Sequence, residues 1–352
     1  MSEYFVVILS VVYFLVISLI MPSMLYPNNI KNIFSNMWPL FAVAMGQTFV
    51  LLLGGIDLSQ TSVMAVTSMI GTMLISSRMS PDIFAGSPLW GTLISENGGP
   101  LGHSPEAIAT LVAIAAMLLA GTLIGLLNGV LIAKFQMPSF MVTLIAQMFY
   151  SAVAILLTKS QNIMNLPDAF CAIGGDGIGI IPYTFFITVA LGALAQFMLS
   201  RMMRGRWIYA TGANTTAARV SGIPTVKVTV FVYALSGFFA AVSSVLYTGR
   251  LMMGRPTLGS DILNDVIGAT VIGGTSMFGG KGKISWTLFG VLFYAILSAS
   301  LTQLRLDSFT INVVKGLVIL AAATLDVVRT RMQQRTIPEA APESKKEAAV
   351  NG

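Results

Sequence analysis

Long runs without charge are the feature that most restricts how this chain can fold. Charged residues make up only 10% of the chain, and 55% of its residues are hydrophobic, whereas a soluble domain carries about 25% charged residues. The few charges fall in short clusters between runs of roughly 20 apolar residues, the length that a helix needs to cross a bilayer. The sequence therefore predicts an all-α polytopic membrane protein and excludes a soluble fold.

Ten such runs are candidate transmembrane helices. The run that starts near Ile262 contains Asp265 and breaks at Gly279-Gly280, so this one is a candidate re-entrant segment. The last run is interrupted only by Lys315. The ten runs cover residues 4–30, 32–56, 58–77, 107–133, 135–158, 177–200, 228–249, 262–278, 284–304 and 308–325.

Lysine and arginine are distributed unevenly between the two ends of these spans. Thirteen fall on the side that carries both termini and six on the other side. The positive-inside rule therefore places both termini and the longest loop, 201–227, in the cytoplasm, and the loop 78–105 in the periplasm. Residues 1–328 are expected to form one transmembrane domain, and the polar stretch 329–352 a disordered cytoplasmic tail. The thirteen are Lys134, Arg201, Arg204, Arg206, Arg219, Lys227, Lys281, Lys283, Arg329, Arg331, Arg335, Lys345 and Lys346.

Motifs for independent chemistry are absent from the sequence. No G-x-x-x-x-G-K-[ST] phosphate loop occurs, because neither Lys281 nor Lys283 has a glycine at the required distance upstream. The one histidine, His103, lies in a glycine- and proline-rich loop, and the one cysteine, Cys171, has no second cysteine for a disulfide. Basic residues at the ends of membrane spans do not indicate nucleic acid. No catalytic residue, metal or cofactor is expected, and an enzyme that acts alone is disfavoured.

Polar side chains inside the apolar runs are the candidates for a translocation path. An unsatisfied polar group is costly at membrane depth, so each one either bonds a neighbouring helix or lines a polar route. A glycine turn at 54–59 adds Asp57 between two spans. Lys315 is either an anchor at the membrane interface or the partner of Asp265 or Asp261 in an ion pair. The candidate path consists of Gln47, Asp57, Asn128, Gln147, Asn264 and Asp265.

The longest cytoplasmic loop contains a short alanine-rich segment with helix signals at both ends. Asn214 is a favourable N-cap, and Gly222 can end the helix. Such a helix forms a compact knob with little side-chain bulk, which suits docking into a groove of another protein. The alternative is an ordinary amphipathic connector. The residues of the predicted helix body are Ala217, Ala218 and Arg219.

Four stretches of the chain resemble the permease subunits of bacterial ribose/galactose-type sugar importers of the ATP-binding-cassette (ABC) class. Each stretch is mostly glycine and aliphatic residues, but their order makes the resemblance specific, and it extends over most of residues 37–328. The stretches are Gly54-Gly55-Ile56-Asp57-Leu58-Ser59; Gly125-Leu126-Leu127-Asn128-Gly129 with Pro138-Ser139-Phe140; Gly212 to Ile223, of the form G-x-N-x-x-A-A-x-x-S-G-I; and Asp265 through Gly280 with Val314-Lys315-Gly316-Leu317.

The resemblance implies a multi-pass protein of the bacterial inner membrane that imports a monosaccharide or similar polyol by alternating access. It implies as partners ABC ATPase subunits on separate chains, a periplasmic solute-binding protein, a second permease subunit in a homo- or heterodimer, and membrane lipid. It also implies that the ATPases dock on the alanine-rich segment and that ATP hydrolysis belongs to those partners. The residues assigned to this coupling are Gly212, Asn214, Ala217, Ala218, Arg219, Ser221, Gly222 and Ile223.

Two other transport classes remain as alternatives. An ion-coupled secondary transporter of a small polar solute needs ligands for the coupling ion, and Asp57 and Asp265 are the candidates. A passive channel needs no docking knob.

Overall fold

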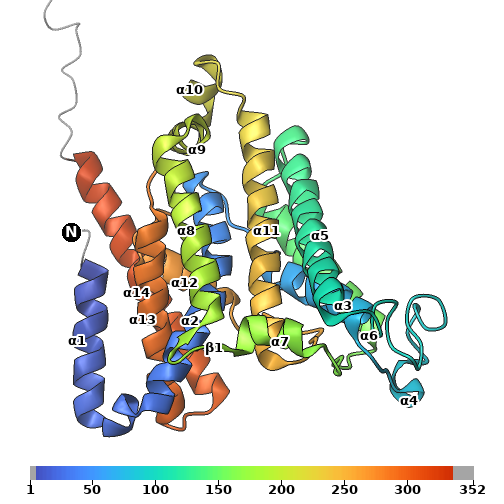
Figure 1. The fold of residues 1–352 in the computed structure, drawn as a ribbon. Helices are drawn as coiled ribbons and strands as arrows, with labels where there is room; N and C mark the ends of the chain where they lie inside the picture. The colour runs from blue at the N-terminus through green and yellow to red at the C-terminus, as the bar shows by residue number, and fades with distance from the viewer. Residues whose placement is uncertain (1–4, 336–352) are drawn as a thin grey trace, which may run out of the picture.

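The chain folds into a bundle of long helices that lie side by side (Figure 1). This computed structural model describes residues 5–335. A short hairpin of β1 (Gly177–Ile178) and β2 (Ile181–Pro182) is the sheet of the described chain. The helices are α1 (Phe5–Ile20), η1 (Pro22–Leu25), α2 (Pro27–Leu52), α3 (Gln60–Ile75), α4 (Pro81–Phe84), α5 (Glu106–Lys134), α6 (Ser139–Thr158), α7 (Asp168–Gly175), α8 (Tyr183–Arg201), α9 (Met203–Ala213), α10 (Thr215–Val220), α11 (Thr225–Leu251), α12 (Leu263–Ile272), α13 (Ile284–Gln303) and α14 (Ser308–Arg335).

The surface of the bundle is suited to lipid. Within residues 5–335, five helices are long and apolar enough to cross a membrane, namely α5, α6, α8, α11 and α13. Large apolar side chains point outward from the helices, as shown by Leu111 and Met148, each 69% exposed, and by Phe309, 84% exposed. Lipid is the solvent that tolerates such a surface. The prediction of an all-α polytopic membrane protein is confirmed.

Some helices begin or end away from the predicted boundaries. The run 4–30 divides into α1, η1 and the start of α2, because Pro22 and Pro27 each occupy the first turn of a new helix. The run 177–200 begins with the β1–β2 hairpin and becomes helical after Pro182. The last helix, α14, continues to Arg335, past the boundary predicted at residue 328. Arginine and glutamine favour helix, so the helix extends beyond the apolar run. The rest of the predicted tail, 336–352, lies outside the described residues.

The run around 262–278 forms a helix of half length. α12 has ten residues, and an extended segment then leads to α13. The backbone N–H of Ile284 at the start of α13 donates to Gln196 Oε1 at 2.9 Å, beside the last turns of α8. The segment therefore crosses the bundle instead of re-entering. Gly273, Thr275 and Ser276 in its first half are buried by protein, as non-helical structure at membrane depth requires, whereas Phe278 and Lys281 near its end are exposed.

The core consists mainly of α2, α3, α11 and α13, and α5 packs against α11. Every residue of α2 from Met37 to Leu52 is buried. α5 approaches α11 closely because Gly121, Gly125 and Gly129 repeat every four residues on one face. A Cβ on Gly125 would lie 2.2 Å from the carbonyl oxygen of Tyr233 on α11. Only glycine allows the two backbones to lie at this distance.

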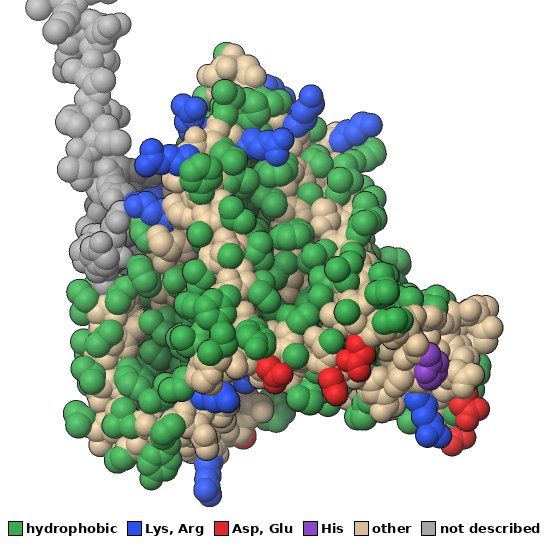
Figure 2. Space-filling view, in the orientation of Figure 1, with side chains coloured by type: hydrophobic (Ala, Val, Ile, Leu, Met, Phe, Trp, Pro, Cys, Tyr) green, Lys and Arg blue, Asp and Glu red, His purple; other side chains and the backbone are tan. Residues whose placement is uncertain are grey.

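The two ends of the bundle differ in charge (Figure 2). One end carries α9 and α10 and is rich in lysine and arginine; we call it the α10 end. The opposite end carries α4, α7 and the segment 78–105 with His103; we call it the α7 end. Seven exposed acidic residues lie at the α7 end, namely Asp82, Glu96, Glu106, Asp168, Asp176, Asp261 and Asp307.

Candidate functional site

A pair of short helices, α9 and α10, protrudes from one end of the bundle (Figure 1). Asn214 separates them, and its Oδ1 accepts a hydrogen bond from the Ala217 backbone N–H at 2.9 Å. Gly222 follows α10 with a φ of 80°, the left-handed conformation that commonly ends a helix. The short helix and its two end signals are therefore as predicted. α9 was not predicted, because two glycines and two arginines in Met203–Ala213 interrupt its helical pattern.

Ala218 lies on the inner face of α10. Its exposed fraction is 4%, and its carbonyl oxygen accepts the Ile223 N–H at 3.0 Å. Ala218 therefore packs against the chain that follows the helix. Val220, by contrast, is 84% exposed. Among the other residues assigned to coupling, Asn214, Ala217, Arg219, Ser221 and Gly222 are exposed, whereas Gly212 and Ile223 are half-buried.

The end of α9 is attached to the bundle through backbone contacts. A Cβ on Gly212 would lie 1.7 Å from the Leu52 carbonyl oxygen at the end of α2. The same oxygen accepts the Gly280 N–H at 2.9 Å. The Tyr209 hydroxyl donates to the Gly282 carbonyl oxygen at 2.6 Å, and burial raises the pKa of Tyr209, which keeps the donor proton in place. We call the meeting point of Leu52, Gly212 and Gly280 the glycine junction.

A buried polar cluster surrounds the break between α2 and α3. Asp57 is 2% exposed, and its Oδ1 accepts hydrogen bonds from the Ser59 N–H at 2.9 Å and the Ser59 hydroxyl at 2.6 Å. Its Oδ2 accepts the Ser236 hydroxyl of α11 at 2.6 Å. Asn128 Nδ2 donates to Ser59 Oγ at 2.9 Å, and Gln60 Nε2 donates to Ser236 Oγ at 2.8 Å. The cluster thus joins the break to α5 and α11 and satisfies both carboxylate oxygens.

Sequence reasoning identified only part of this cluster. It named Asp57 and Asn128 but missed Gln60 and Ser236. Both lie in apolar runs, so polarity at membrane depth was an available signal. A single serine in such a run is common, because its hydroxyl can bond to a carbonyl of its own helix.

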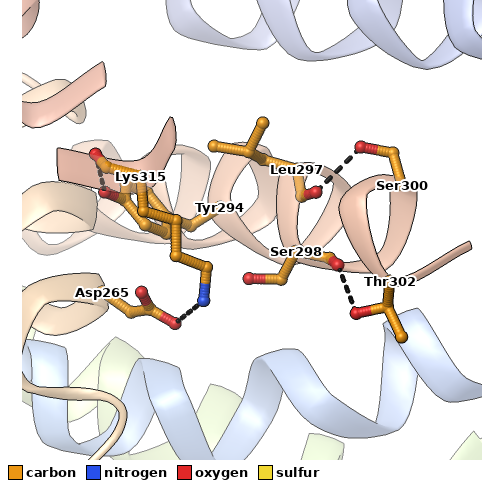
Figure 3. Close-up of polar contacts among 7 residues, drawn as sticks. All are labelled: Asp265, Tyr294, Leu297, Ser298, Ser300, Thr302 and Lys315. Carbon is orange, nitrogen blue, oxygen red and sulfur yellow. Dashed lines mark hydrogen bonds and ion pairs between the residues drawn. The ribbon is translucent and has the colours of Figure 1, made fainter. Parts of the chain in front are cut away.

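A polar cavity of about 540 Å³ lies at the α7 end. It is open on one side and is lined by η1, the first half of α2, the end of α11, the start of α12 and the second half of α13. Asp265 lines the cavity, and Figure 3 shows its Oδ2 facing Lys315 Nζ, 2.8 Å away. The ion pair expected as one interpretation of Lys315 is therefore formed, and the side chain is too buried for an interfacial anchor, at 9% exposure. The polar lining residues are Asn29, Asn32, Asn36, Tyr247, Arg250, Asp265, Ser298, Thr302 and Gln303.

The other candidate path residues belong neither to the buried cluster around Asp57 nor to the cavity beside Asp265. Gln47 is fully buried on α2, and neither polar atom of its side chain has a hydrogen-bond partner among the described residues. Gln147 is half-buried on α6 next to the exposed Met148. Asn264 is exposed, although it adjoins Asp265. The rotation of each helix about its own axis determines whether its polar side chain is buried in the bundle or exposed.

Comparison with known proteins identifies the family. The sequence profile described as "Branched-chain amino acid transport system / permease component" matches residues 29–323. A ribose import permease protein of Haemophilus influenzae is 33% identical over 315 residues, which cover 88% of each chain. Its Bacillus subtilis counterpart is 32% identical over 89% of this chain and 88% of that protein.

An L-arabinose ABC transporter permease protein of Azospirillum brasilense is 27% identical over 94% of this chain and 89% of its own length. No solved structure matches the chain. Because the family profile covers most of the chain and the ribose permeases exceed 30% identity over nearly nine tenths of it, the chain belongs to this family of transport-system permease components, and it is a membrane transport subunit rather than an ATPase.

Proposed function

We propose that this chain is the membrane-spanning subunit of an ABC importer for a monosaccharide or similar polyol. The observation that carries the proposal is the 33% identity, over 88% of both chains, to a protein named as a ribose import permease. Relatives named for L-arabinose and D-allose, at 27% and 29% identity, support the wider class of monosaccharides over ribose alone. A cavity lined by amides and hydroxyls agrees with a hydroxyl-rich solute.

The α10 end faces the cytoplasm in this proposal, and both termini lie on that side of the bacterial inner membrane. The support is the distribution of charge. Lysine and arginine gather at the α10 end, and cytoplasmic segments of membrane proteins carry an excess of these residues. The α7 end then faces the periplasm and receives the solute-binding protein.

The ATPase subunits dock on the exposed face of α10. Val220 and Ala217 present a small apolar surface, and Arg219 adds a charge that can pair with an acidic edge of the partner. A short helix of this kind fits a groove in another protein. The importer contains a second permease subunit, so each ATPase has one such helix to engage.

Movement of α10 reaches the cavity through α2. This helix lines the cavity with Asn29, Asn32 and Asn36 near its start and ends at Leu52 in the glycine junction. Backbones in direct contact transmit displacement, because close-packed interiors compress little. A shift of α9 therefore moves the end of α2 and the segment after α12 together. ATP hydrolysis in the partners supplies the free energy, and the solute binds the outward- and inward-facing states with different affinity.

The docking proposal is tested with Val220→Asp and Ala217→Trp in one chain. Both side chains are exposed, so the variant is expected to insert and fold. ATP-dependent uptake and copurification of the ATPases should fall about tenfold or more, the effect of losing a central contact. Leu93→Asp is the control, because it places an acid on a residue that is 40% exposed at the α7 end. This variant should retain uptake and should still copurify with the ATPases. Normal uptake in a well-expressed double variant would refute docking through α10.

A further inference from the structure

One oxygen of the buried carboxylate of Asp265 is left open. The Asp265 side chain is 8% exposed, and Lys315 bonds only its Oδ2. Oδ1 is buried and has no hydrogen-bond partner among the described residues. The other buried carboxylate, that of Asp57, accepts three hydrogen bonds. Because a buried charged oxygen without a partner is costly, Oδ1 of Asp265 is an unsatisfied acceptor in the wall of the cavity, and a slight turn of the carboxylate is needed before a ligand can reach it.

The groups around this oxygen supply both donors and acceptors. Figure 3 shows the Ser298 hydroxyl directed from α13 towards the Asp265–Lys315 pair. On another wall of the cavity, the Arg250 guanidinium donates to Asn36 Oδ1, which fixes both side chains. Further amides of α2 and α13 complete the lining. Four separate elements thus bring hydrogen-bonding groups, both neutral and charged, to one open-mouthed cavity.

The Asp265–Lys315 pair favours a neutral ligand on its wall of the cavity, and Arg250 on another wall adds one positive charge, which disfavours a cation. The Asp265 carboxylate repels an anion, whereas the Lys315 ammonium beside it repels a cation. Their mutual bond leaves a pair with no net charge next to the cavity. Vicinal hydroxyl groups suit such a surface, because each hydroxyl donates to a carboxylate or amide oxygen and accepts from an amide, ammonium or guanidinium. A volume of about 540 Å³ lies within the usual range of small-molecule sites.

We propose that this cavity binds the transported solute itself, as a neutral polyhydroxyl compound, with Asp265 Oδ1 accepting a hydrogen bond from a solute hydroxyl. Ser298 donates to or accepts from a neighbouring solute hydroxyl, and Lys315 holds the carboxylate in place. The inference rests on the proposed import function and adds a solute site within the permease, separate from any binding protein.

The site is tested by protection of a cysteine in the purified full-length permease, without partners. Ser298→Cys is placed in a Cys171→Ser background, and its alkylation by a hydrophilic maleimide is timed with D-ribose, L-arabinose, D-allose or inorganic phosphate. At least one sugar should slow the reaction, by about tenfold at ten times its Kd. His103→Cys in the same background lies on the loop of the α7 end, outside the cavity, and should show no protection. The proposal would be overturned if no sugar protected position 298, if position 103 were protected equally, or if only phosphate gave protection.

A second pair of variants separates this site from the import function as a whole. Ser298→Leu fills the cavity and should abolish sugar uptake by the assembled importer, whereas ATP hydrolysis stimulated by the binding protein persists. Ser298→Ala keeps the cavity open and should retain at least part of the uptake. Full uptake in Ser298→Leu would refute the proposed solute site, but it would not contradict the importer function. If the unaltered chain shows no ATP-dependent uptake with its partners, the importer proposal itself fails, whatever the cysteine assay shows.

Discussion

Gly212 lies directly against the backbone of Leu52, because a Cβ on Gly212 would lie 1.7 Å from the Leu52 carbonyl oxygen. Gly280 donates its backbone N–H to that oxygen at 2.9 Å. The end of α9, the end of α2 and the segment after α12 therefore meet around a single carbonyl group. No side chain separates the protruding helices from the helix that lines the cavity.

Gly212→Ala is expected to destabilise the purified permease by about 1–3 kcal/mol or more, the usual cost of overpacking. The added methyl group would have to displace backbone rather than a flexible side chain. Thermal unfolding in detergent measures the change. Gly316→Ala is the control, because a Cβ at that position of α14 meets no atom within 4 Å. Equal stability of the Gly212 variant and the unaltered chain would contradict the packing at the junction.

Lys315→Met is expected to destabilise the permease by about 3–5 kcal/mol, because it leaves the buried Asp265 carboxylate without a counter-ion. Adding Asp265→Asn should restore part of this loss, since the charge is then removed together with its partner. A double-mutant cycle of unfolding free energies measures the coupling. Strict additivity of the two single changes would show that the ion pair does not hold α14 against α12.

Ser236→Ala is expected to lower the free energy of unfolding by about 1–3 kcal/mol. The change leaves Asp57 Oδ2 unsatisfied in the core and also removes the hydroxyl that accepts from Gln60. Ser243→Ala on the same helix is the matched control. Its hydroxyl donates only to the Pro39 carbonyl oxygen, so its loss should cost less. Unfolding free energies of the two variants are compared directly. If Ser243→Ala lost more stability than Ser236→Ala, the buried polar cluster around Asp57 would not have the stabilising role expected of it.

Cys171 is expected to react slowly with an impermeant maleimide at pH 7. Burial raises the pKa of its thiol, and the nearby carboxylates of Asp168 and Asp176 raise it further. The thiolate is the reacting form, so its fraction at pH 7 is small and increases about tenfold per pH unit below the pKa. Labelling in intact spheroplasts, which exposes only the periplasmic face, should therefore become faster from pH 7 to pH 9. A rate that levels off by pH 9 would contradict the raised pKa, because a thiol with the ordinary pKa of about 8.5 is mostly ionised there.

Engineered cysteines test the orientation in a Cys171→Ser background. His103 and Thr216 are both exposed, at the α7 end and the α10 end respectively. A cysteine at position 103 should react in intact spheroplasts, and one at position 216 only after the membrane is opened. The reverse pattern would place α10 on the periplasmic side.

The class of protein and the position of most helices can be predicted from the order of residues alone. Lipid imposes its requirement on each segment separately, since every span must be apolar for about 20 residues, so the pattern is visible without a partner. The cap at Asn214 and the helix end at Gly222 were predictable for the same reason, because the groups that form them lie within a few residues of each other. Pro22 and Pro27 are equally local signals for the start of a new helix.

Only the tertiary structure decided which polar groups meet. Ser236 reaches Asp57 across 179 positions of sequence, and Lys315 reaches Asp265 across 50. A rotation of one helix by half a turn would exchange its lipid face for its core face, and such rotation is set by packing against other helices, as in the close approach of α5 and α11 at Gly125. The burial of Ala218, the exposure of Asn264 and the open oxygen of Asp265 all follow from that packing, which no single segment encodes.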